Sequence, residues 1–209
     1  MQLSVLAILV SLLTSVNSLL SLRGNWSLID VRFLFFLALG QFPAIVFGIG
    51  LLNFLESNEV GILKIILGSF LVLGGLLSFI NPRPLKRISG RLTVFIAGIL
   101  GGTLGGLFSA SGPVLGLFAY SQPMPLAQIR ATLLASFLFT TTARTAVVSF
   151  QGSIKPEILM LFLLALPIVL LGTFLGKKIL PPVSESTTRR FAFSIILMIG
   201  FWTVLETIL

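Results

Sequence analysis

The chain has 209 residues, of which 56% are hydrophobic and 10% are charged, and its mean hydropathy is +1.11. A soluble domain of this size does not carry so much apolar surface, so the composition excludes a soluble globular protein and predicts a polytopic membrane protein. The net charge is +8, but the basic residues cluster in short connections between apolar runs, which is the positive-inside pattern of membrane proteins and excludes a nucleic-acid-binding face.

Seven apolar segments follow one another along the chain, each close to the roughly 20 residues that a helix needs to cross a bilayer. In chain order they are residues 2–21, 32–55, 61–80, 92–119, 126–149, 156–176 and 189–208. The first segment lacks a preceding basic region and is longer than the apolar part of a usual signal peptide, so it is predicted to be a membrane helix. No long linker divides the segments, and we expect one all-α transmembrane domain over residues 1–209.

A weak internal repeat relates the two halves of the chain. Residues 41–48 (QFPAIVFG) resemble residues 165–172 (ALPIVLLG), and each stretch has a proline five residues before a glycine. The offset is 124 residues, which pairs the first three apolar segments with the last three. We therefore predict a first repeat over residues 1–80 and a second repeat over residues 92–209.

The repeat predicts that the first half is incomplete. The Gly-rich segment that begins at residue 92 would have its counterpart 124 residues earlier, about 32 residues before Met1. We expect either a truncated or mis-started form of a longer protein, or a natural variant that lacks this segment.

Charge placement predicts how the segments cross the membrane. The connection before residue 92 is cytoplasmic by the positive-inside rule, because it carries Arg83, Lys86, Arg87 and Arg91. If residues 92–119 crossed the membrane once, a second basic cluster within residues 177–190 would lie outside. If they enter, turn at residues 109–113 and return, that cluster lies inside and the repeats are inverted, as in many secondary transporters.

Residues 109–113 (Ser-Ala-Ser-Gly-Pro) are the main candidate for a binding site. They follow an apolar run with five glycines: Gly98, Gly101, Gly102, Gly105 and Gly106. Gly112 and Pro113 should open the helix, and opened backbone at membrane depth must be buried or line a watery cavity. Its free N–H groups and the hydroxyls of Ser109 and Ser111 are suited to an oxyanion. The alternative is a kinked helix in which the glycines only allow close packing.

The next apolar segment adds two arginines to the candidate site. Arg144 follows three threonines, and an arginine within a membrane span usually faces a cavity or a partner. Arg130 lies near the start of its segment, where an interfacial anchor is the alternative, and the same alternative applies to Thr132, two residues further on. We expect Arg130, Thr132 and Arg144 to contribute to substrate binding, with the interface as the alternative for each arginine.

The chain has no Cys and no His, which excludes thiol chemistry and removes the commonest general base and haem ligand. We expect no cofactor and no metal ion. An integral membrane enzyme acting on lipid is a weaker alternative, because its serines lack a histidine base and acids are few.

Residues 97–120 (AGILGGTLGGLFSASGPVLGLFAY), followed by residues 129–144 (IRATLLASFLFTTTAR), resemble the second signature region of the sulfite exporter TauE/SafE family. Members of that family look like two repeats of about four apolar segments, each opening with a Gly-rich GxxGxGGP break. This chain departs from the pattern at residues 109–113, where glycines are usually more numerous, and it lacks the first repeat's Gly-rich segment. The resemblance implies export of small anions such as sulfite or organosulfonates.

We therefore predict a multi-pass secondary transporter that exports small anions across the plasma membrane. Moving one negative charge out of a cell held at about −100 mV gains roughly 2.3 kcal/mol, so a uniporter needs no coupled ion. No His and no clearly mid-membrane acid is available to relay protons. The alternative is a non-transporting membrane subunit or an inactive fragment.

Overall fold

The structure is a computed structural model that describes residues 3–58, 61–62, 65–66, 68–69, 72–73, 76, 85–152, 156–178, 198, 201 and 205. Within this part of the chain it is all-α, as predicted, with six α-helices and a short 3₁₀ helix, η1 (Trp26–Leu28). The six are α1 (Leu3–Leu22), α2 (Val31–Asn58), α4 (Arg91–Phe108), α5 (Gly112–Tyr120), α6 (Leu126–Phe150) and α7 (Pro156–Lys178).

Five of these helices, α1, α2, α4, α6 and α7, are long and apolar enough to cross a membrane. The prediction of a polytopic membrane protein is therefore confirmed. The two further apolar segments predicted at residues 61–80 and 189–208 lie largely outside the described residues.

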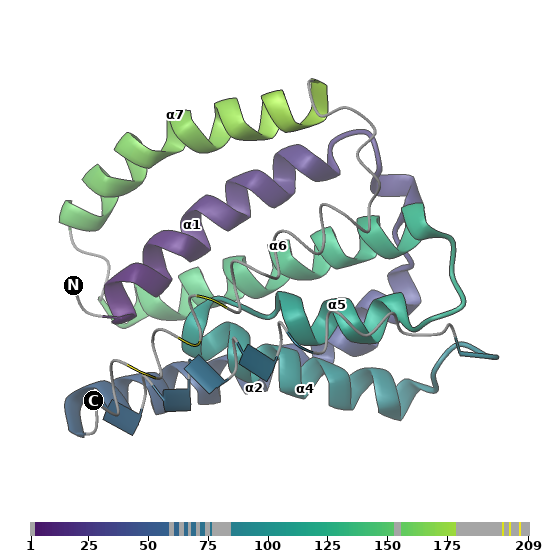
Figure 1. Ribbon diagram of the computed structural model, residues 1–209, viewed down its shortest axis with the longest axis horizontal. Helices are drawn as coiled ribbons and strands as arrows, with labels where there is room; N and C mark the ends of the chain where they lie inside the picture. The colour runs from purple at the N-terminus through teal and green to yellow at the C-terminus, as the bar shows by residue number, and fades with distance from the viewer. Residues whose placement is uncertain are drawn as a thin grey trace.

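The helices lie side by side along one direction (Figure 1). α1 packs between α7 and α6, and α2 packs against both α6 and α4. Neighbours in this arrangement need not follow one another in the chain, so the interior combines side chains from distant segments. The polar side chains described below come from α1, α2, α4 and α6.

Glycines allow α2 and α4 to approach at backbone contact. Gly98, Gly102 and Gly106 recur every four residues on α4, and a Cβ atom added at each would collide with the backbone of α2. Gly40 and Gly48 on α2 are equally close to the backbone of α4. Such stripes of small residues are a usual basis of helix pairing in membranes. For these three α4 glycines, close packing is the role that the structure supports.

The segment predicted over residues 92–119 forms two helices with an interruption at residues 109–111. α4 ends in a left-handed residue, Ser109, with φ 57° and ψ 24°, whose N–H donates to the Gly105 carbonyl oxygen at 3.0 Å. α5 then runs back along α4 (Figure 1). The Leu85 N–H, before α4, donates to the Ser121 carbonyl oxygen, after α5, at 2.8 Å. The two ends of this hairpin therefore meet.

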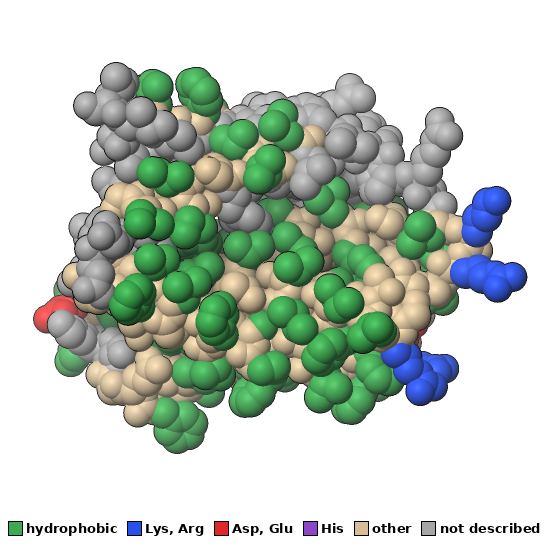
Figure 2. Space-filling view, turned by 90° about the horizontal axis from the view of Figure 1, so that it is seen from below, with side chains coloured by type: hydrophobic (Ala, Val, Ile, Leu, Met, Phe, Trp, Pro, Cys, Tyr) green, Lys and Arg blue, Asp and Glu red, His purple; other side chains and the backbone are tan. Residues whose placement is uncertain are grey.

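The outer surface is apolar and the charges lie at its ends. Figure 2 shows hydrophobic side chains over most of one face, Lys and Arg at one end and an acidic side chain at the other. Exposed apolar residues include Phe35, Phe47, Leu163 and Ile168, which suits contact with lipid. The interior, by contrast, holds several fully buried polar side chains. A functional site is therefore expected among the buried polar side chains.

Candidate functional site

Arg144 is the largest fully buried side chain in the described part of the chain, with an exposed fraction of 1%. Its Nε donates to the Gly106 carbonyl oxygen at 3.0 Å, and its Nη1 donates to Ser11 Oγ at 3.2 Å. Both acceptors are neutral, so neither offsets the charge of the guanidinium.

The interruption after α4 creates the acceptor for Arg144. Gly106 lies in the last turn of α4, where carbonyl oxygens have no partner further along the helix. The negative end of the helix dipole also points toward this position, which favours a cation. The interruption at Ser109 therefore also provides a hydrogen-bond acceptor for Arg144.

A chain of hydroxyl groups continues from Arg144 to α1. The Ser11 and Ser109 Oγ atoms are 2.6 Å apart, and Ser109 Oγ donates to the Ala7 carbonyl oxygen at 2.7 Å. Arg144 can thus donate to Ser11, Ser11 to Ser109, and Ser109 to the backbone of α1. This chain joins α6, α1 and the break between α4 and α5 at one point.

A second buried polar group lies between α2 and α6. Gln41 is fully buried, and its Nε2 donates to Ser136 Oγ at 3.0 Å and to Thr140 Oγ1 at 2.9 Å. Thr140 also lies against Gly105, where an added Cβ would come within 2.5 Å of its methyl group. Hydrogen bonds of this kind hold membrane helices together.

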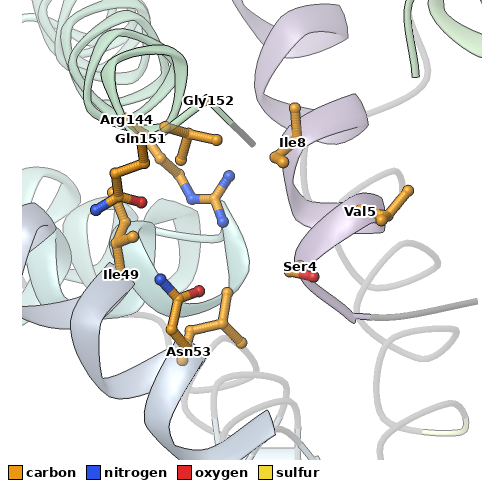
Figure 3. A pocket seen from close by; sticks show the side chains of 10 residues that line it. Ser4, Val5, Ile8, Ile49, Asn53, Arg144, Gln151 and Gly152 are labelled. Atoms are coloured by element: carbon orange, nitrogen blue, oxygen red, sulfur yellow. The ribbon is translucent and has the colours of Figure 1, made fainter. Parts of the chain in front are cut away.

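Arg144 borders a cavity of about 340 Å³ between α1, α2 and α6 (Figure 3). Its polar lining consists of Arg144, Ser4, Asn53 and Gln151, and apolar residues such as Ile8 and Ile49 complete the walls. The guanidinium group of Arg144 and the amide of Asn53 both point into the space. At about 30 Å³ per water molecule the cavity has room for roughly ten waters, or for a small anion that keeps part of its hydration.

The cavity opens at the acidic end of the molecule. Ser4 and Gln151 lie near the start of α1 and just after α6, and Glu56, in the last turns of α2, accepts a hydrogen bond from the Ser4 N–H at 3.2 Å. Arg23 and Arg32 lie at the opposite ends of α1 and α2, and Arg91 begins α4 beside Arg32. A cavity with one buried cation and three neutral polar groups can bind a small anion.

Comparison with known proteins identifies the family. The family model described as "Sulfite exporter TauE/SafE" matches residues 1–203. The chain belongs to the sulfite exporter TauE/SafE family. The resemblance inferred from residues 97–144 is thereby confirmed. TauE/SafE proteins are membrane transporters and not enzymes, so the alternative of a lipid-modifying enzyme is wrong.

One relative is the "Probable sulfite/organosulfonate exporter TauE" of Cupriavidus necator. It is 38% identical over 202 residues, which cover 97% of this chain and 79% of the relative. No solved structure matches the chain. The TauE/SafE chain described here is thus a multi-pass membrane exporter with five candidate spans among its described residues.

The structure places the predicted site residues of this TauE/SafE protein in two groups. Ser109 and Arg144 are joined through Ser11, as described above. Ser111 is buried beside Gly105, and Gly112 and Pro113 form the first turn of α5. Ser109 and Ser111 thus lie in the interruption between α4 and α5, and Gly112 and Pro113 follow it directly.

Arg130 and Thr132 lie apart from that group. Thr132 is buried, and its Oγ1 accepts a hydrogen bond from the Asp30 N–H at 3.0 Å, which ties α6 to the start of α2. Arg130 is exposed near the beginning of α6. Twelve residues of helix separate Thr132 from Arg144, a distance of about 18 Å along the axis.

The site contains four residues that the sequence did not assign to it. Ser11 belongs to the chain of hydroxyl groups, and the cavity lining includes Ser4, Asn53 and Gln151. A signal for the serines was present in α1, where Ser4, Ser11, Ser15 and Ser18 are spaced by seven, four and three residues. This spacing places all four on one face of an otherwise apolar helix. Asn53 and Gln151 lie at segment ends, where polar residues are common and carry little information.

Proposed function

We propose that this TauE/SafE chain exports small oxyanions, with sulfite and organosulfonates as its substrates, and that the anion binds in the Arg144 cavity. The observation that carries the proposal is the burial of Arg144 between two neutral acceptors at the edge of that cavity. The printed description of the Cupriavidus necator relative names the same substrate class.

The energetics favour an anion as the missing partner of Arg144. An arginine at the centre of a membrane helix costs about 2.5–3.5 kcal/mol on insertion scales. Arg144 lies in the last two turns of α6 but is fully buried, so its charge still requires a partner or a watery cavity. A bound oxyanion would accept charge-assisted hydrogen bonds from the guanidinium N–H groups that point into the space. Asn53 and Ser4 supply neutral donors around it.

We propose a direct role in binding for Arg144 and a supporting role for Ser109. Ser109 reaches the guanidinium through Ser11, and residues 111–113 shape the turn that carries it. Arg130 and Thr132, at the other end of α6, are placed outside the cavity in this proposal. Arg130 there suits an interfacial position that attracts anions to the cytoplasmic surface.

We further propose that α4 and α5 form a re-entrant hairpin. The hydrogen bond between the backbones of Leu85 and Ser121 supports this, because it holds the beginning and the end of the hairpin at the same end of the molecule. A second hydrogen bond, from the Ser89 N–H to Gln122 Oε1 at 2.9 Å, joins the same two ends of the hairpin. The turn at Ser109 would then lie within the membrane, next to Arg144.

Helix directions support inverted repeats over residues 1–80 and 92–209. At the offset of 124 residues, α1 corresponds to α6 and α2 to α7, and the members of each pair run in opposite directions (Figure 1). The contacts follow the same symmetry, because α2 packs on α6 and α7 packs on α1. A two-fold axis in the membrane plane produces this relationship.

The charged residues at the two ends of the molecule indicate on which side of the membrane the Arg144 cavity opens. The end with Arg23, Arg32 and Arg91 is cytoplasmic by the positive-inside rule, so the Arg144 cavity opens to the outside. Ser11 lies about 10 Å deeper along α1 than Ser4 and closes the inner end of the cavity through its bonds to Arg144 and Ser109. We propose that this conformation is the one that releases the anion.

Flux measurements in proteoliposomes test the proposal. Vesicles loaded with sulfite, sulfate or an organosulfonate are given an inside-negative potential, and efflux is compared with protein-free vesicles and with the reversed potential. We expect efflux of sulfite or the organosulfonate that increases with the inside-negative potential. Equal efflux from protein-free vesicles would contradict the proposal.

A further inference from the structure

A second cavity, of about 500 Å³, lies at the basic end of the molecule between the beginnings of α2 and α4. Arg32 lines it from α2 and Arg91 lines it from α4. Its remaining walls are largely apolar and include Phe33, Phe36 and Val94. The cavity is thus charged at its edge and apolar inside.

The two arginines line one cavity from different helices. The Arg91 Cζ atom lies 5.5 Å from the centroid of the Phe36 ring, so the guanidinium is held over an apolar wall of the cavity. Asp30 also lines the cavity and brings one negative charge, so the two arginines leave the lining positive by one charge. The Asp30 Oδ1 accepts a hydrogen bond from the Phe33 N–H at 2.9 Å in the first turn of α2.

We propose that this cavity binds the phosphate headgroup of an anionic phospholipid from the cytoplasmic leaflet. Basic pockets between transmembrane helices on the cytoplasmic side are suited to anionic headgroups. Both arginines can form bidentate hydrogen bonds with phosphate oxygens. The inference does not depend on which anion the protein transports.

The surface beyond the cavity distinguishes a lipid from free phosphate. The outer faces of α2 and α4 below the arginines carry the exposed side chains of Phe35, Leu39, Leu92 and Ile96. Figure 2 shows that this side of the molecule is mostly hydrophobic, with the basic side chains confined to one end. A phospholipid fits both the cavity and the surface beyond it, since its headgroup meets the arginines and its acyl chains cover the apolar face. Free phosphate would contact only the arginines.

Bound lipid would also support the hairpin of α4 and α5. Ser89 lines the same cavity, and its N–H donates to Gln122 Oε1 beyond the end of α5. A headgroup that joins Arg32 and Arg91 would therefore tie the base of the hairpin, where this bond lies, to the beginning of α2. We expect an anionic lipid to raise the thermal stability of the purified protein by this route.

Lipid binding to the detergent-purified protein tests the proposal. Native mass spectrometry would count bound phosphatidylglycerol and phosphatidylcholine on the wild type, on the double variant Arg32→Gln/Arg91→Gln and on the control double variant Arg23→Gln/Arg87→Gln. The control removes the same charge from the same end of the molecule, outside the cavity lining. We expect the wild type to retain phosphatidylglycerol at least tenfold more strongly than phosphatidylcholine, with this preference lost in the first variant and kept in the control.

Three outcomes would overturn the proposal. The first is equal retention of the two lipids by the wild type, a result that requires no variant to fold. The second is an equal loss in both double variants, which would indicate general surface charge. The third is displacement of phosphatidylglycerol by an equal concentration of inorganic phosphate, which would indicate a free phosphate site.

Discussion

Arg144 donates a hydrogen bond from its Nε to the carbonyl oxygen of Gly106 at 3.0 Å, which links α6 to the last turn of α4. The two residues are 38 positions apart in the chain. The carbonyl is free because α4 stops at Phe108, and α4 stops because Ser109 adopts a left-handed conformation. The interruption in the Gly-rich segment and the buried arginine are therefore parts of one arrangement.

The left-handed conformation of Ser109 gives a direct test of this interruption. A side chain at φ 57° is strained, and glycine removes that strain, whereas alanine keeps it. Both changes remove the hydrogen bonds to Ser11 and Ala7. We therefore expect Ser109→Gly to be more stable than Ser109→Ala by about 1 kcal/mol. Thermal unfolding in detergent measures the difference, and equal stability of the two variants would argue against the left-handed residue.

The close contact of α2 and α4 predicts unequal effects of Gly→Ala changes. A methyl group at Gly106 would collide with the carbonyl oxygen of Ile45, so we expect Gly106→Ala to destabilise the protein by about 1–3 kcal/mol. Gly50 and Gly116 have open space at the same position, and alanine there should be neutral or slightly stabilising. Thermal unfolding of the three variants checks this order. A Gly106→Ala protein as stable as Gly116→Ala would rule out the close packing.

Gln41 should couple α2 to α6 by a measurable amount. Gln41→Met removes the donor to Thr140, and Thr140→Val removes the acceptor. Interhelical hydrogen bonds in membrane proteins have coupling energies of about 0.6 kcal/mol on average, with a maximum of about 1.7 kcal/mol. We expect a double-mutant cycle on unfolding free energies to give a coupling energy in this range. A coupling of zero would mean that the two residues do not interact.

Asn53 faces Arg144 across the cavity and offers a test of the site that keeps the arginine (Figure 3). Asn53→Asp introduces a carboxylate that competes with the substrate for the guanidinium, whereas Asn53→Ala only removes a neutral group. We expect the apparent affinity for sulfite to fall at least tenfold in Asn53→Asp and less than threefold in Asn53→Ala. Concentration dependence of flux in proteoliposomes gives both values. Equal affinities in the two variants would place the anion elsewhere.

Much of the fold was predictable because the bilayer imposes simple rules on a sequence. Apolar segment length predicted α1, α2, α6 and α7, since a membrane helix needs about 20 apolar residues. The chemistry of Gly112 and Pro113 predicted the neighbourhood of the interruption between α4 and α5. In each case the cause is local, within a few residues of its effect.

The composition of the candidate site was less predictable because it depends on which helices are neighbours. Ser11 connects Ser109 with Arg144, and that role arises only once α1 packs against α6. Glycine stripes were equally ambiguous, since Gly98 and Gly106 face α2 while Gly105 faces Thr140 of α6. Depth along a helix also matters. The sequence grouped Thr132 with Arg144, although their hydrogen bonds lie at opposite ends of α6.

Potential-driven sulfite efflux from proteoliposomes would show whether Arg144 binds the exported anion. The comparison uses wild type, Arg144→Gln, Arg144→Lys and the exposed Arg23→Gln, with size-exclusion chromatography to establish that each variant is folded. We predict that Arg144→Gln loses at least tenfold in flux, that Arg144→Lys retains part of it, and that Arg23→Gln equals wild type. Wild-type flux in a folded Arg144→Gln protein would mean that Arg144 does not bind the exported anion.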